Sequence, residues 1–173
     1  DPRQRAWIEV NPSAIQLNTT NLRKRLLDGC LLMAVVKADG YGHGAETVAR
    51  AALRGGANNL GVATLQEGID LRQVGLDCPI LVLGNLIEKE DLSACLHWQL
   101  MPTISSFREA LLCQNLAKEG GGNFPLHIKV DTGMTRLGCD LDEAVKLVKR
   151  VKDLNNIHLK GVYSHLAFAD GEL

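Results

Sequence analysis

The 173-residue chain has no long hydrophobic run. Its longest apolar stretch, CLLMAVV at 30–36, is far shorter than the roughly 18 residues that suggest a membrane span. The N-terminal segment DPRQRAW also lacks the apolar core of a signal peptide. We therefore predict a cytoplasmic protein that has no membrane partner.

The sequence has little excess charge of either sign. Its formal net charge is −1, with Lys and Arg mixed among Asp and Glu along the chain. Such a chain offers no basic face to a phosphate backbone, so we expect no nucleic-acid partner. With 46% of its residues apolar and 23% charged, the composition is that of a globular domain rather than of a disordered segment.

Paired cysteines are missing. No CxxC pair is present for zinc or redox chemistry, and no cluster of His, Cys and carboxylate residues has the spacing of metal ligands, so we expect no metal. The five cysteines are odd in number, widely spaced and mostly in apolar stretches: Cys30, Cys78, Cys95, Cys113 and Cys139. We predict that they are buried, reduced thiols.

The two ends lack features of a complete protein. There is no initiator methionine, and the chain stops at YSHLAFADGEL, after a strand-like run and without the helix that the preceding pattern leads one to expect. We expect a fragment, in which residues 1–173 form one incomplete N-terminal domain.

Strand-like and helix-like stretches alternate along the chain, as in repeated βα units. Helical periodicity is clearest over 141–154, and capping residues are predicted at Asn11, Ser106 and Asp140. An early strand is predicted at WIEV (7–10). Six later runs rich in Leu, Ile and Val predict strands buried on both faces: 31–37, 59–64, 79–84, 99–104, 126–131 and 157–165.

Repeated βα units fit either a doubly wound open sheet or a (β/α)8 barrel that lacks two units. An open nucleotide-binding sheet would carry GxGxxG, or a lysine after its glycines, in the first βα turn. Here AVVKADGYGHGAE (34–46) places the lysine before glycines spaced GxGxG. Polar residues also end several predicted strands, where barrel enzymes have their active sites: Lys37, Thr64, Asp131 and His165. We therefore predict an α/β fold of the TIM-type barrel kind, present as about six βα units.

Lys37 is the residue whose chemistry decides the function. A lysine at a strand end could extend its ammonium into solvent along its methylene stem. Partial burial would instead favour the neutral amine, a nucleophile that forms an imine with an aldehyde. The glycines permit close approach of a ligand to the backbone, and Tyr41 supplies a hydroxyl nearby. The residues alone leave both interpretations open.

Three motifs together resemble the alanine racemase family, whose members use pyridoxal 5′-phosphate (PLP). AVVKADGYGHGAETVA is similar to the family's cofactor-lysine segment, LHIKVDTGMTRLG to its fifth barrel strand and loop, and VYSHLAFAD to the end of its sixth strand. The opening WIEVNPSAIQLNTTNLRKRL is similar to the family's N-terminal strand and first helix. The matches occur in the family's order and spacing over nearly the full length of the chain.

The resemblance assigns roles to four residues. Lys37 would bind PLP as a Schiff base and act as the base on the D-alanine side, and Tyr41 would hydrogen-bond the cofactor phosphate. Arg136 would lie near the cofactor's phenolic oxygen and the substrate carboxylate, which its planar fork of donors suits. His165 would organise hydrogen bonds around the site. Without the resemblance, Arg136 is more simply interpreted as part of a surface salt bridge. Tyr41 and His165 are then more simply interpreted as structural residues.

Lys129 and Asp131 lie two residues apart on one predicted strand and so face the same side, which predicts an ordinary ion pair. In the family the matching lysine can be carbamylated, and its anion then holds the arginine. The resemblance thus makes Lys129 a candidate carbamylated residue. His43 is predicted to be a loop residue that packs near the cofactor rather than an acid or base.

The resemblance implies a PLP-dependent racemase that interconverts L-alanine and D-alanine for peptidoglycan precursor supply. The family's second base is a tyrosine on a C-terminal β-domain of the partner subunit, and much of its phosphate site comes from the last two barrel strands; this sequence contains neither region. We expect the full-length protein to be an active homodimer and the fragment alone to be inactive. Three alternatives stay open: a non-catalytic PLP-binding barrel protein, a PLP-dependent decarboxylase of basic amino acids, and a catalytically silent structural fragment.

Overall fold

A computed structural model describes residues 5–168 of the chain. The chain groups into two compact units, Asp1–Gly61 and Val62–Leu173. The registered strand pairs, β1 with β2 and each neighbouring pair from β3 to β6, follow chain order and are parallel, as predicted for βα units. The elements are α1 (Pro12–Arg23), β1 (Met33–Val35), α2 (Lys37–Gly42), α3 (Ala45–Arg54), β2 (Asn59–Val62), α4 (Leu65–Gln73), β3 (Ile80–Asn85), α5 (Lys89–His97), β4 (Met101–Ile104), α6 (Phe107–Glu119), β5 (Phe124–Lys129), α7 (Leu141–Lys152) and β6 (Ile157–Tyr163).

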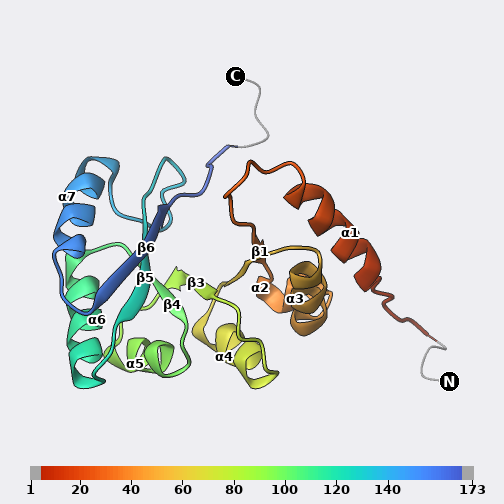
Figure 1. The fold of residues 1–173 in the computed structure, drawn as a ribbon, viewed down its shortest axis with the longest axis horizontal. Coiled ribbons are helices and arrows are strands. Elements are labelled where there is room, and N and C mark those ends of the chain that lie inside the picture. Colours follow the sequence, from red (N-terminus) through yellow and green to blue (C-terminus); the bar gives the residue numbers. More distant parts are fainter. Residues whose placement is uncertain (1–4, 169–173) are drawn as a thin grey trace. The chain divides into compact units, whose positions relative to one another are not determined.

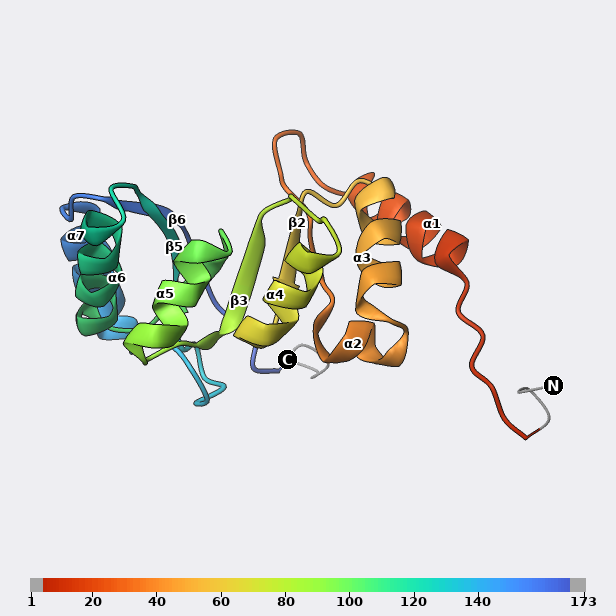
Figure 2. The ribbon, with the colours of Figure 1, turned by 90° about the horizontal axis from the view of Figure 1, so that it is seen from below.

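In the first unit, two helices pack closely beside a short parallel strand pair. Helix α1 begins as predicted, because the Asn11 side chain accepts a hydrogen bond from the Ala14 N–H and Pro12 occupies the first helical turn. It lies against α3 in both views (Figures 1 and 2). A Cβ on Gly55, directly after α3, would lie 2.6 Å from the Gln16 carbonyl oxygen, so a glycine is needed where the two helices meet.

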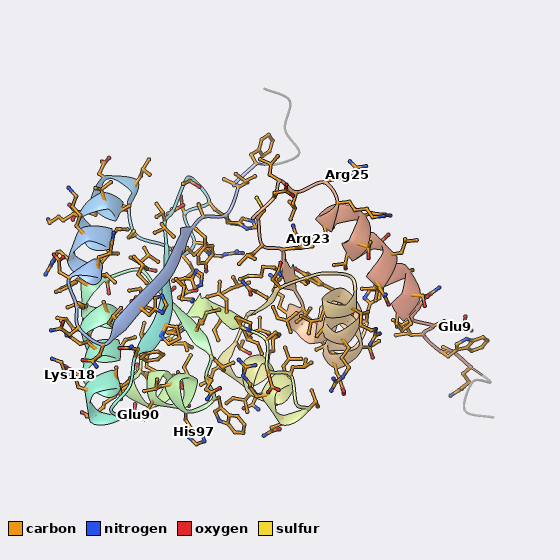
Figure 3. All side chains as sticks on the ribbon, viewed as in Figure 1. Glu9, Arg23, Arg25, Glu90, His97 and Lys118 are labelled. Atoms are coloured by element: carbon orange, nitrogen blue, oxygen red, sulfur yellow. The ribbon has the colours of Figure 1, made fainter. Side chains whose placement is uncertain are left out.

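In the second unit, β3 to β6 form the parallel core and α4 to α7 lie along one side of it, with α6 and α7 beside each other next to β5 and β6 (Figure 1). The predicted capping box at Ser106 and Glu109 is present, and Thr64 and Glu67 form another. Polar side chains such as those of Glu90, His97 and Lys118 point outward from α5 and α6 (Figure 3). The apolar sides of these helices therefore face the strands.

Two predictions of local structure are wrong. Residues 7–10 form no strand, since nothing in the described chain pairs with them, and Trp7 and Ile8 are 58% and 80% exposed. Asp140 precedes α7, but its side chain makes no capping hydrogen bond; its carbonyl accepts from the Glu143 N–H at 3.1 Å instead. Strand β6 ends at Tyr163, so His165 lies just beyond it.

The cysteines are free thiols. Cys95, Cys113 and Cys139 are buried as predicted, whereas Cys78 is half-buried and Cys30 is exposed, so the prediction is wrong for Cys30. Burial raises the pKa of Cys113 to about 12, which keeps that thiol protonated and unreactive. Within residues 5–168, none of the helices has the length and apolarity needed to cross a bilayer.

Candidate functional site

The backbone reverses its helical handedness directly after Lys37. Ala38, Asp39, Gly40 and Tyr41 have φ angles of +50°, +52°, +61° and +56° inside α2. For residues with a Cβ this conformation costs about 1–2 kcal/mol each. Strain of this kind persists only where the surroundings hold it, and it is concentrated at functional sites.

Hydrogen bonds and a glycine contact hold this turn against α3. The Asp39 side chain accepts from the Ala45 N–H at 2.7 Å, and its carbonyl accepts from the Gly44 N–H at 2.9 Å. A Cβ on Gly40 would lie 2.8 Å from Cγ2 of Val48, so only a glycine lets the turn approach α3 this closely. Gly40 thus serves the packing of the turn on α3, which differs from the close approach of a ligand predicted for the motif's glycines.

Lys37 and Tyr41, two of the predicted site residues, lie together in this turn. Lys37 is half-buried above the buried Val36, and its Nζ lies 5.8 Å from the centroid of the Tyr41 ring, within the range of a cation–π contact. Tyr41 is 59% exposed, so its hydroxyl is accessible to a ligand. The turn therefore presents an amine and a phenol side by side.

Lys129, Arg136 and His165, the other predicted site residues, line one small hollow in the second unit. Lys129 ends β5 and is only 6% exposed, whereas Arg136 and His165 are exposed on the segments that follow β5 and β6. Because β5 and β6 are parallel neighbours, their carboxyl ends bring these residues together. This is the convergence that strand-end positions predict.

The segment from Lys129 to Cys139 is closed by backbone hydrogen bonds. The Cys139 N–H donates to the Lys129 carbonyl, and the Asp131 N–H donates to the Cys139 carbonyl, each at 2.9 Å. Gly138 has a φ of +126°, and a Cβ there would lie 2.5 Å from the Asp131 nitrogen. This closure fixes Arg136 beside the end of β5.

Asp131 serves mainly as an acceptor within that loop. Its Oδ1 accepts hydrogen bonds from the Thr135 and Gly133 N–H groups, each at 3.0 Å. These bonds are the main cause that lowers the pKa of Asp131 below its usual 3.8, and the charge of Lys129 contributes least. The ion pair predicted with Lys129 is thus a minor part of its environment.

A polar pair beside Lys129 was missed by sequence reasoning. The Thr103 hydroxyl donates to the Val82 carbonyl at 2.7 Å, so the proton shared at 2.8 Å between the Thr103 and Tyr163 oxygens comes from Tyr163. The Tyr163 ring centroid lies 5.7 Å from the Lys129 Nζ. Burial raises the pKa of Tyr163 and keeps the phenol neutral. A threonine in the apolar run QLMPTI was the available signal.

Comparisons with known proteins give matches over nearly the whole chain. A family model described as "Alanine racemase, N-terminal domain" matches residues 10–173. The chain is 66% identical over 172 residues to the alanine racemase of Prochlorococcus marinus, covering 99% of this chain and 45% of that protein. It is 46% identical over 168 residues to the alanine racemase of Synechocystis sp., covering 97% and 45%. The chain thus spans less than half the length of these relatives.

Solved structures show the same fold. Alanine racemase from Clostridium difficile 630 in complex with cycloserine superposes with a TM-score of 0.84 at 34% identity, covering 90% of this chain and 43% of that one. Alanine racemase from Bacillus anthracis with bound L-Ala-P gives 0.83 at 33% identity, covering 95% and 42%. These likenesses confirm the predicted fold, a TIM-type barrel present in part.

Proposed function

Since the chain belongs to the alanine racemase family, through the family's N-terminal domain, we propose that its full-length protein is a PLP-dependent racemase that interconverts L-alanine and D-alanine. The observation that carries this proposal is Lys37, a half-buried amine that opens a strained turn and contacts Tyr41. We further propose that the full-length protein is a cytoplasmic homodimer that supplies D-alanine for peptidoglycan precursors.

The residues of the turn fit PLP. The aldehyde of PLP would form a Schiff base with an amine, which Lys37 supplies. The phosphate of PLP would accept hydrogen bonds, and the exposed Tyr41 hydroxyl supplies a donor. The backbone at Gly42 leaves room, because a Cβ placed there would meet nothing within 4 Å. When bound, PLP provides the electron sink that stabilises the carbanion left by the departing α-proton.

The chain's own residues would divide the remaining work. Lys37 would hold the cofactor covalently and then accept or return the proton on the D-alanine side, while Tyr41 would donate to the phosphate. Arg136 would receive the substrate carboxylate with its paired N–H donors, and His165 would orient hydrogen bonds around it. Lys129 lines the same hollow as Arg136 and is our candidate for carbamylation. The second base would lie outside residues 1–173, so we expect this fragment alone not to racemise alanine.

Borohydride reduction tests the proposal. The full-length gene product, reduced after saturation with PLP, should carry the cofactor on the peptide that contains Lys37 and should racemise L-alanine. Lys37→Ala should lose both properties. Lys118→Ala, on the exposed side of α6, should lose neither.

Other outcomes would contradict the proposal. An adduct on a different lysine, or no adduct, would remove Lys37 from the site. Release of carbon dioxide from lysine or arginine, without racemisation of alanine, would favour the decarboxylase instead. An adduct without any turnover would favour a non-catalytic PLP-binding protein.

A further inference from the structure

Backbone hydrogen bonds close the left-handed turn after Lys37, from the Gly40 N–H to the Val36 carbonyl and from the Gly44 N–H to the Asp39 carbonyl, each at 2.9 Å. Three of its four left-handed residues, Ala38, Asp39 and Tyr41, carry a Cβ and would relax toward right-handed or extended backbone if released. Relaxation would separate Tyr41 from Lys37, because their contact spans the whole turn. The side chains of His43 and Asp39 add further hydrogen bonds that hold this backbone conformation.

His43 makes one such contact at the end of the turn. Its Nδ1 lies 3.0 Å from the Tyr41 carbonyl oxygen and 3.2 Å from the Gly40 carbonyl oxygen. Both partners can only accept, so Nδ1 must carry the proton. The ring therefore acts as a donor that ties the last two left-handed residues together, and it does so in both its neutral and its charged form.

Asp39, within the turn, accepts a hydrogen bond where His43 donates one. Its carboxylate accepts a hydrogen bond at 2.7 Å from the N–H of Ala45, which is the first residue of α3. Gly44, which precedes α3, gives that helix no side-chain cap. Asp39 thus fastens the turn to the start of α3 and satisfies a free N–H of that helix at the same time.

We propose that Asp39 and His43 are positioning residues that clamp the left-handed turn and so hold the Lys37 amine beside the Tyr41 phenol. The role given to Lys37 here rests on the proposed function. In this proposal neither Asp39 nor His43 needs to touch the cofactor. An acid or base role for His43 is the competing interpretation, because its Nε2 is left unprotonated in the neutral ring.

Matched substitutions separate the clamp from other roles. Asn at position 43 places its Nδ2 donor on the same Cγ that carries the histidine Nδ1, but it does not titrate. Asn at position 39 keeps Oδ1 as an acceptor and removes the charge. The variants are Asp39→Ala and Asp39→Asn, His43→Ala and His43→Asn, made in the full-length gene product. Asp39→Glu keeps the charge but displaces the acceptor, and it serves as a second test should Asp39→Ala fold poorly.

The first measurement is amide hydrogen exchange of the peptide covering 38–48, without PLP. Each alanine variant should exchange at least about tenfold faster there than the wild type, and each asparagine variant should stay within about twofold. Asp39→Glu should follow Asp39→Ala. This measurement does not depend on the cofactor or on catalysis.

The second measurement is the Kd for PLP, from the absorbance change on titration, with kcat and KM for L-alanine. The alanine variants should bind PLP about tenfold more weakly, and the asparagine variants should match the wild type in Kd and in the pH profile of kcat. If the His43→Asn variant lost one limb of the pH profile of kcat, that result would overturn the clamp in favour of acid or base chemistry. Wild-type exchange rates in both alanine variants would also overturn it.

Failure of the proposed function looks different. A wild-type protein without a Lys37 adduct would refute the cofactor role, yet the exchange measurement would still decide whether Asp39 and His43 hold the turn. Asparagine variants that exchange as fast as the alanine variants would show that charge or ring identity matters, and would overturn the hydrogen-bond clamp.

Discussion

The turn after β1 and the loop after β5 both present candidate site residues just beyond a parallel strand, but they are held by different means. The turn places side-chain-bearing residues in left-handed backbone and fastens them through Asp39 and His43. The loop is closed by backbone hydrogen bonds between Lys129, Asp131 and Cys139 and depends on Gly138. Positions 39 and 43 should tolerate a residue that keeps the hydrogen-bonding atom in the same place, whereas position 138 should not tolerate a single added carbon.

The largest expected effect is that of Gly138→Ala. Its Cβ would lie 2.5 Å from the Asp131 nitrogen and 2.7 Å from the Val130 carbonyl carbon, and backbone atoms cannot move aside as a side chain can. We expect a loss of about 3 kcal/mol in the free energy of unfolding. Gly42→Ala in the turn, with φ of +81° and nothing within 4 Å, should lose only about 1 kcal/mol.

Urea unfolding of both variants measures this difference, as shifts in midpoint at unchanged slope. Equal losses at the two glycines would break the comparison, because the steric demand at Gly138 would then be no greater than the conformational cost at Gly42.

A smaller effect is expected at Thr103, which supports the second region from the neighbouring strand. Thr103→Val would leave the Val82 carbonyl and the Tyr163 hydroxyl without their partner, at a cost of about 1–3 kcal/mol in stability. Thr103→Ser keeps the hydroxyl and should lose roughly half of this or less. Thermal unfolding of the pair provides the measurement. Identical losses would show that the methyl group, and not the hydrogen bonds, stabilises this position.

Local signals in the sequence predicted much of the fold. Asn11 and Ser106 were recognised as caps because a cap is made by residues a few positions apart. The prediction of a strand at 7–10 was wrong, because an alternating or apolar composition does not supply a neighbouring strand to pair with. Asp140 fits the capping pattern, but the Glu143 N–H donates to its backbone carbonyl rather than to its side chain, and the pattern does not reveal which oxygen accepts.

The candidate site was predicted only in part, for similar reasons. Lys129, Arg136 and His165 converge as expected because parallel strands end at one edge. The clamp by Asp39 and His43 was not predicted, since no propensity leads one to expect left-handed backbone at Ala38 or Tyr41.

The pairing of Tyr163 with Thr103 was missed because it joins strands 60 residues apart in the chain. Such a contact depends on the register of β4, β5 and β6, which composition does not set.

The smallest expected effect is the pH dependence of the loop after β5, which Asp131 should cause. It tests how far a side chain, in addition to the backbone, holds this loop. Hydrogen bonds from Thr135 and Gly133 lower the pKa of Asp131 below 3.8, so its carboxylate contributes stability above the unfolded-state pKa and loses it as the pH falls through the lower folded-state pKa. Protection of the Gly133 and Thr135 amides, corrected for intrinsic exchange, should therefore fall in acid in the wild type. Asp131→Asn keeps an acceptor without a titrating charge, so its protection should be independent of pH in that range. If both proteins lost protection in parallel, the loop would be held by its backbone closure at Cys139 alone, and the aspartate would be incidental to it.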